Sequence, residues 1–245
     1  GIVIFPSLAR ELSLGRTDHY LEILARSLRI LAFVMLPIAA LGIVLRLGVV
    51  ELLLGYGKFD AAAVRLTADT LALFLLGLAA HSLIAVLARA FYARQDTRTP
   101  TVAAVLAVVI NTVLAVALVG SLGLPAIGLA IAIAAWSEAV VLLVWLRRHE
   151  PSFDLAGVVS VAIRCLVAAA VAATVVYLGL NALAIGDLGA NAGSLAGKLT
   201  ILAITAVATA IGLAIYAAIT LVLGVRELRT LMTITLDLVR RRRSA

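Results

Sequence analysis

The sequence predicts an all-α fold, a polytopic bundle of transmembrane helices, and three observations support this prediction. Six long apolar stretches follow one another along the chain, and the loops between them alternate in positive charge. Of the 245 residues, 64% are hydrophobic and 13% are charged, whereas ordinary soluble domains carry roughly 25% charged residues. A soluble domain cannot bury so much apolar surface, so we expect an integral membrane protein.

Each apolar stretch is close to the ~20 residues that a helix needs to cross the hydrocarbon core of a bilayer. The six predicted spans are 30–54, 68–88, 101–119, 124–146, 158–180 and 199–223. With them the chain divides into the tail of a truncated transmembrane helix (1–9), a cytoplasmic amphipathic connector (10–29), four transmembrane helices (30–148), two C-terminal transmembrane helices (149–223) and a basic cytoplasmic tail (224–245).

Two short segments precede the first complete span. The apolar run from Gly1 to Pro6 has no charged segment before it, so it is typical of the end of a helix and not of a signal peptide. We therefore expect this chain to be the C-terminal part of a longer protein. In the connector, Leu21, Leu24 and Leu28 recur at helical spacing, which favours an amphipathic helix over a simple solvated linker.

Charge placement predicts the orientation of the spans. Fifteen of the 20 Lys and Arg residues lie in the segments 10–29, 89–98, 147–148 and 226–243, and four lie in the alternate loops. Cytoplasmic loops of membrane proteins carry the excess of Lys and Arg, so we expect these segments and the C-terminus in the cytoplasm. The net charge of +7 then reflects topology and contact with anionic lipid, and no nucleic-acid partner is expected.

Proline and small residues within the spans indicate where helices bend or pack closely. Pro37 lies inside the first span, where proline removes a backbone hydrogen bond, so it is a candidate hinge. Gly123, Gly128 and Ala132 follow a small-residue pattern that lets helices approach one another. This pattern fits ordinary close packing or, alternatively, a sliding interface in a moving protein.

Few polar groups lie at membrane depth, where they are costly and often functional. His81 lies in the second span, Asn111 in the third and Glu138 in the fourth. Glu138 could carry a proton, neutralise an arginine or help to hold a cation, or it pairs locally. His81 is either a packing group or a proton relay, and Asn111 either bonds a neighbouring helix or lines a site. The three are candidates for ion or proton coupling.

Motifs of nucleotide, metal and hydrolase chemistry are missing from the sequence. It contains no Gly-rich phosphate loop, no GxSxG and no HExxH, and the single Cys165 offers no metal-ligand spacing. We therefore expect a protein that is not an enzyme, that carries no metal or cofactor, and that is driven by an ion gradient, the membrane potential or a downhill substrate.

One loop resembles a known family. Residues 87–100, LARAFYARQDTRTP, are similar to the loop between two C-lobe helices of the MurJ/MviN lipid II flippases, which belong to the multidrug/oligosaccharidyl-lipid/polysaccharide exporter superfamily. Three weaker pieces follow the family's order: FPSLAR at 5–10, LLGYGKF at 53–59 and GLPAIGLA at 123–130. The resemblance implies the C-terminal lobe of a two-lobe exporter fold plus two extra C-terminal helices, with the N-terminal lobe outside this sequence.

The resemblance also implies a function. Such a protein moves undecaprenyl-diphosphate-linked disaccharide-pentapeptide from the inner to the outer leaflet of the bacterial plasma membrane by alternating access, for peptidoglycan biosynthesis. The spans 158–180 and 199–223 would form a groove for the lipid tail, and Arg89, Arg94 and Arg98 would meet the diphosphate or else only mark the cytoplasmic side. Partners would be the lipid-linked substrate, membrane lipids, the N-terminal lobe and cell-wall synthesis proteins.

Three other functions stay open from the sequence. The first is export of another lipid-linked glycan, or drug/cation antiport, within the same superfamily. The second is a lipid-modifying membrane enzyme, against which the lack of acidic clusters speaks. The third is a non-transporting scaffold that recruits cell-wall enzymes through its basic tail.

Overall fold

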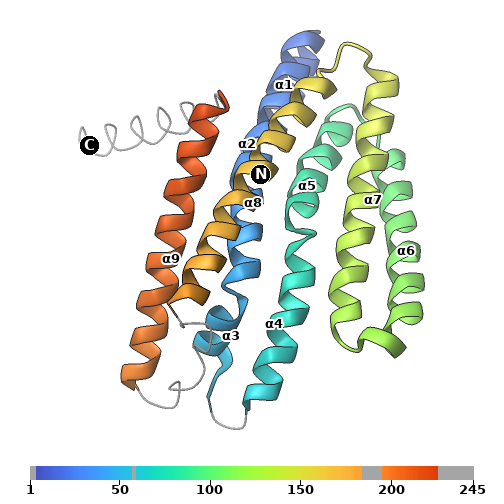
Figure 1. The fold of residues 1–245 in the computed structure, drawn as a ribbon. Helices are drawn as coiled ribbons and strands as arrows, with labels where there is room; N and C mark the ends of the chain where they lie inside the picture. The colour runs from blue at the N-terminus through green and yellow to red at the C-terminus, as the bar shows by residue number, and fades with distance from the viewer. Residues whose placement is uncertain (1–3, 57–58, 184–194, 226–245) are drawn as a thin grey trace, which may run out of the picture.

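A computed structural model describes residues 4–56, 59–183 and 195–225, and this part of the chain folds into a bundle of helices (Figure 1). The helices are α1 (Ile4–Ser13), α2 (Thr17–Val44), α3 (Arg46–Leu54), α4 (Ala61–Leu75), α5 (Leu78–Ala93), α6 (Arg98–Leu122), α7 (Pro125–His149), α8 (Leu155–Ala182) and α9 (Leu195–Val222). Most of the predicted tail at 224–245 and of the predicted loop at 181–198 lies outside the described residues.

The predicted polytopic helical fold is confirmed. Five described segments are long and apolar enough to cross a membrane, namely α2, α6, α7, α8 and residues 196–222 of α9. Helices α4 and α5 meet at a bend of 42° and make a sixth span if they are taken together. The described structure therefore contains a helical counterpart for each of the six apolar stretches.

The first span differs from the prediction. Helix α2 runs without interruption from Thr17 to Val44, so the second half of the expected connector 10–29 belongs to the same helix as the span. The expected stretch 30–54 is divided instead at Leu45, where α3 begins. The candidate hinge Pro37 lies buried within continuous α2, eight residues before this break.

The apolar stripe of the predicted connector explains why its second half is part of α2. Leu24 and Leu28 are fully buried together with Tyr20, in a core that also includes residues of α5 and α7. The stripe therefore packs against protein, which extends the helix into the bundle. The turn that separates α1 from α2 contains Gly15 at a φ of 71°, a left-handed conformation that glycine adopts without steric cost.

The second span is broken where the prediction has one helix. Gly77 separates α4 from α5 and lies against α7, where an added Cβ would be 2.8 Å from the Cα of Ala132. The indole Nε1 of Trp136 donates a hydrogen bond of 2.9 Å to the carbonyl oxygen of Leu76. This bond satisfies a carbonyl at the break, because a helix end leaves backbone acceptors without intrahelical partners.

The small-residue pattern lies partly at helix contacts. Gly128 of α7 abuts α4 so closely that a Cβ there would be 2.6 Å from the carbonyl oxygen of Thr70. Ala132 is buried, whereas Gly123 forms the turn before α7 at a φ of 64°. Close backbone approach is how membrane helices gain packing contacts without a hydrophobic driving force.

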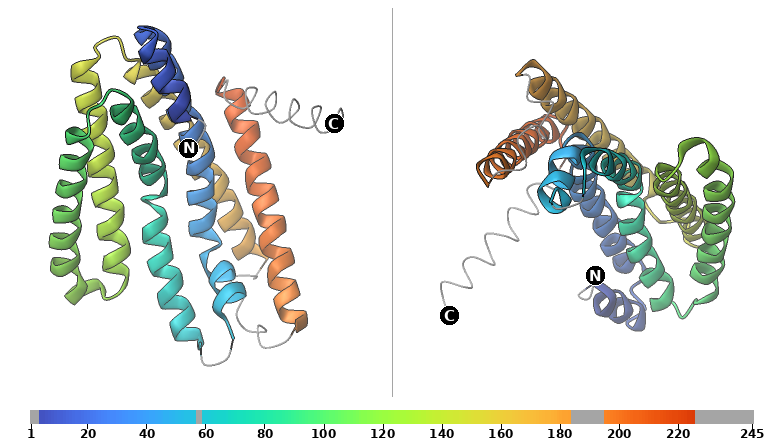
Figure 2. Two further views of the ribbon diagram at one scale, coloured as in Figure 1. Left: turned by 180° about the vertical axis from the view of Figure 1, so that it is seen from behind. Right: turned by 90° about the horizontal axis from the view of Figure 1, so that it is seen from below.

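The described basic segments share one end of the bundle. The start of α2, the end of α5, the start of α6 and the end of α7 lie together at the top of Figure 1, as does the start of α8. Figure 2 shows α6 and α9 at opposite edges of the bundle. At the same upper end Arg164 of α8 donates a hydrogen bond of 3.2 Å to the carbonyl oxygen of Leu223, just beyond α9.

Candidate functional site

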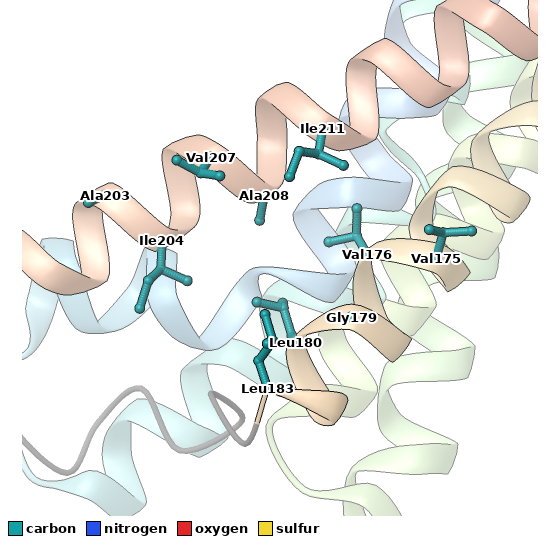
Figure 3. A pocket seen from close by; sticks show the side chains of 10 residues that line it. All are labelled: Val175, Val176, Gly179, Leu180, Leu183, Ala203, Ile204, Val207, Ala208 and Ile211. Atoms are coloured by element: carbon teal, nitrogen blue, oxygen red, sulfur yellow. The ribbon is translucent and has the colours of Figure 1, made fainter.

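An apolar groove runs between α8 and α9, and its volume is about 400 Å³ (Figure 3). Its lining consists entirely of aliphatic residues and glycine. These are Val175, Val176, Gly179, Leu180 and Leu183 of α8 and its C-terminal end, and Ala203, Ile204, Val207, Ala208 and Ile211 of α9. Figure 3 shows side chains of α9, such as Ile204 and Ala208, that point across the gap toward Leu180.

A close helix contact at Gly212 and the missing side chain at Gly179 give the groove its shape. Gly212 of α9 lies so close to α2 and α8 that an added Cβ would be 2.5 Å from a methyl group of Leu41 and 3.2 Å from one of Val176. Below this contact the lining of α8 includes Gly179, whose Cβ position has no atom within 4 Å. The two helices touch at Gly212 and leave room beyond it.

The groove suits a hydrocarbon chain. It offers neither hydrogen-bond donors nor charges from its lining side chains, so a polar ligand would lose its hydration there without compensation. Many of its residues are exposed, including Leu183 at 70% and Val207 at 57%. In a membrane such a surface is covered by lipid, and a long flexible apolar chain can fill it.

Of the predicted diphosphate contacts, Arg89 lies on α5, Arg94 in the loop that follows it and Arg98 at the start of α6. Their environments differ. Arg94 forms an ion pair with Glu150 at the end of α7, and the two side chains are 29% and 15% exposed. Arg94 is therefore engaged in joining two helices. Arg98 is exposed at the start of α6, and Arg89 is half-buried on α5; neither forms an ion pair with a described carboxylate.

Hydrogen bonds order the turn between Arg94 and Arg98. The carboxylate of Asp96 accepts hydrogen bonds of 3.0 Å from the backbone N–H groups of Arg98 and Thr99. A hydrogen bond with the Thr99 side chain, followed by these backbone bonds, holds the pKa of Asp96 below its ordinary value. Gln95 has a φ of 62°. The turn thus presents Arg98 from a well-defined backbone.

The three predicted coupling residues occupy three different helices. His81 of α5 is exposed and stacks on Phe74 across the bend, with ring centroids 6.0 Å apart. Glu138 is half-buried on α7. The Oδ1 atom of Asn111, on α6, is buried and has no hydrogen-bond partner among the described residues. No described hydrogen bond or ion pair joins these residues, and the role of each in ion or proton coupling stays a prediction.

A polar cluster at the upper end was missed by sequence reasoning. Asp154 caps the start of α8 through the backbone N–H of Gly157 at 2.8 Å and pairs with Arg29 of α2 at 3.3 Å. Arg147 donates to the carbonyl oxygens of Pro151 and Phe153. The Asp at a helix start was a visible signal, but its partner lies 125 residues away along the chain.

These features define a multi-pass α-helical membrane protein with an apolar groove between α8 and α9. The family model described as "Lipid II flippase MurJ" matches residues 1–191. A probable lipid II flippase MurJ of Rhizobium tropici is 38% identical over 149 residues, and one of Rhizobium meliloti is 34% identical over 185 residues. The chain belongs to the MurJ lipid II flippase family.

The matches cover a part of each relative. The aligned segments make up 61% and 74% of this chain but 28% and 34% of the Rhizobium tropici and Rhizobium meliloti proteins. A solved structure of lipid II flippase MurJ in an inward closed conformation aligns with a TM-score of 0.66 and 19% identity, over 90% of this chain and 42% of that chain. That likeness shows a shared fold over less than half of that chain.

Proposed function

We propose that this chain is the C-terminal lobe of a lipid II flippase, which moves the undecaprenyl-diphosphate-linked disaccharide-pentapeptide from the inner to the outer leaflet. The observation that carries the proposal is the wholly aliphatic groove between α8 and α9, in a chain of the MurJ family. A groove without polar lining fits the isoprenoid tail of the substrate, which stays in the apolar phase while its headgroup crosses.

The mechanism divides the substrate between two environments. The anionic headgroup crosses in a cavity between this lobe and an N-terminal lobe, which opens first to one side and then to the other. The tail lies in the α8–α9 groove. Arg98 and Arg89 meet the diphosphate during loading, because guanidinium groups match phosphate oxygens, whereas Arg94 holds α5 to α7.

The orientation and the driving force belong to the same proposal. The end of the bundle with the basic segments faces the cytoplasm, together with the C-terminus, in a bacterial plasma membrane. Transport is driven by an ion gradient or the membrane potential without a cofactor, and Glu138, His81 and Asn111 are the candidates for coupling. Cell-wall synthesis proteins are the expected partners.

A substitution that fills the groove tests the proposal. Gly179→Leu projects a leucine into the open space of the groove, and the matched control Gly120→Leu adds the same side chain to α6, where the Cβ position is also free of contacts. Both variants are placed in the full-length protein. We expect Gly179→Leu to lower lipid II flipping in proteoliposomes and to fail in rescue of cells depleted of their flippase, while Gly120→Leu does neither. Equal activity of both variants would refute a role for the groove.

A further inference from the structure

We propose that Tyr216 of α9 is a positioning residue for the α8–α9 groove: its hydroxyl binds the backbone carbonyl that Pro37 leaves free in α2, and this bond anchors α9 just beyond the point where α8 and α9 touch. The inference deepens the proposed function and rests on it in one respect, because it takes the groove as the place of an isoprenoid chain. The hydrogen bond and its cause are independent of that function.

A carbonyl without its helical donor lies in the middle of α2. In an α-helix the carbonyl oxygen of each residue accepts a hydrogen bond from the N–H group four residues later, and for Phe33 that residue is Pro37. Proline has no N–H group, yet α2 continues through this position from Thr17 to Val44. Phe33 is buried, and a buried acceptor without a partner costs free energy.

The hydroxyl of Tyr216 supplies the missing donor. It donates a hydrogen bond of 2.8 Å to the carbonyl oxygen of Phe33, 183 residues away along the chain. Tyr216 is buried, and its ring packs on that of Phe33 with centroids 5.3 Å apart. The indole of Trp136 meets the carbonyl of Leu76 at the α4–α5 bend in the same way. At both irregularities a side chain of another helix satisfies the backbone acceptor.

One face of α9 carries both a wall of the groove and the anchor. Ala208, Gly212 and Tyr216 follow at intervals of four residues, so they lie on the same face of the helix. Ala208 lines the groove and belongs to a buried cluster with Leu41 of α2, and Gly212 lies against the same leucine. Ala208 and Gly212 offer α2 little surface, whereas Tyr216 adds a ring and a directed hydrogen bond.

The proline makes this hydrogen bond specific to one position along α2. The neighbouring carbonyls of Ala32 and Val34 keep their helical donors at Leu36 and Ile38, whereas that of Phe33 has none. A shift of α9 along α2 by one residue moves the hydroxyl by about 1.5 Å, which is enough to break the bond. The bond therefore fixes the register of α9 against α2, and with it the place of the α9 wall of the groove.

Amide hydrogen exchange of the full-length protein in nanodiscs tests the anchor. Tyr216→Phe removes the hydroxyl and keeps the ring, and Tyr177→Phe is the matched control, because Tyr177 lies exposed on α8. We expect Tyr216→Phe to speed exchange about tenfold in residues 33–41 of α2 and 203–211 of α9, since a buried acceptor without a partner favours local opening. Tyr177→Phe is expected to change neither segment.

Restoring the backbone donor gives a second arm of the experiment. Pro37→Ala supplies an N–H group to the carbonyl of Phe33. Pro125→Ala is the matched control, because Pro125 lies at the start of α7, where an N–H group has no acceptor within the helix. In the Pro37→Ala background we expect Tyr216→Phe to change exchange in residues 33–41 by less than about twofold, whereas in the Pro125→Ala background the full effect remains.

Binding of undecaprenol, an isoprenoid without a charged headgroup, reports the state of the groove in the same nanodiscs. We expect Tyr216→Phe to weaken this binding about threefold, because the α9 wall is then less preorganised. Tyr177→Phe is expected to bind undecaprenol as the unsubstituted protein does. A hydroxyl that only stabilises the fold would leave the affinity of the folded protein unchanged.

The possible outcomes separate this inference from the proposed function. Unchanged exchange in Tyr216→Phe would overturn the anchor, and so would an equal effect of Tyr216→Phe in the Pro37→Ala background. Faster exchange with unchanged undecaprenol binding, while Gly179→Leu loses that binding, would overturn the positioning role and leave the groove intact. Unchanged undecaprenol binding by Gly179→Leu would overturn the groove as the place of the chain, and the positioning role with it.

Discussion

The ion pair between Arg94 and Glu150 predicts which arginine of the α5–α6 loop supports the fold and which is free for substrate. It joins residues 56 positions apart, at the ends of α5 and α7. Beside it, the hydroxyl of the buried Tyr20 donates a hydrogen bond of 3.0 Å to the carbonyl oxygen of Ala90. The perturbations are Arg94→Ala, Glu150→Gln and the double variant, each in the full-length protein.

The magnitude follows from the exposure of the two side chains. Removal of one partner from a fully buried pair costs about 3–5 kcal/mol, whereas an exposed pair contributes about 0.2–1 kcal/mol. At 29% and 15% exposure this pair is intermediate, so we expect each single variant to lower the free energy of unfolding by about 1–3 kcal/mol. Arg94→Ala costs more, because it leaves the less exposed Glu150 carboxylate without its partner.

The assay combines unfolding in detergent with lipid II flipping measured at a temperature where every variant is folded. The double variant is expected to lose less stability than the two single variants together, which is the signature of a direct interaction. Arg98→Ala is the matched control, because Arg98 is exposed and forms no ion pair with a described residue; its stability is expected to change by less than about 0.5 kcal/mol. Loss of flipping by folded Arg94→Ala, with no effect of Glu150→Gln on stability, would refute the reasoning.

Three further predictions concern the bend and the loop. Gly77→Ala is expected to destabilise the protein by about 1–3 kcal/mol, because the added methyl group meets the backbone of α7; the control Gly120→Ala, in open space, is expected to leave thermal unfolding unchanged. Trp136→Phe removes the hydrogen bond at the bend and is expected to cost about 0.5–1.5 kcal/mol in chemical unfolding, so an unchanged value would contradict a capping role. Asp96→Asn is expected to lower the stability at pH 7, because the lowered pKa of Asp96 means that the folded state favours the carboxylate. The difference in stability from the unsubstituted protein is present above the ordinary Asp pKa of about 3.9 and is lost as pH falls through the lowered pKa. A difference that persists at low pH would contradict this assignment.

The helical bundle was predictable because its causes are local in sequence. A run of apolar residues long enough to cross a bilayer is sufficient to define a span, and each of the six runs has a helical counterpart. The connector was predicted as a helix from the spacing of Leu21, Leu24 and Leu28, but its environment was not. Periodicity shows that a helix has an apolar face, and it does not show whether lipid or protein covers that face.

The bend and the ion pair depend on contacts between distant segments. A glycine within an apolar run is compatible with a continuous helix, and Gly77 becomes a break point through its contact with Ala132 and the bond from Trp136. In the same way Arg94, Arg98 and Arg89 are equivalent in sequence as loop or helix-end arginines. Only the approach of Glu150 assigns one of them to the fold.

Hydropathy and the placement of charge along the sequence were therefore enough to predict the helical spans and their orientation, because each span satisfies its own backbone hydrogen bonds in lipid. The groove needed tertiary structure. Its aliphatic residues have the same composition as any lipid-facing surface, and they line a groove only because α8 and α9 touch at Gly212 and separate beyond it.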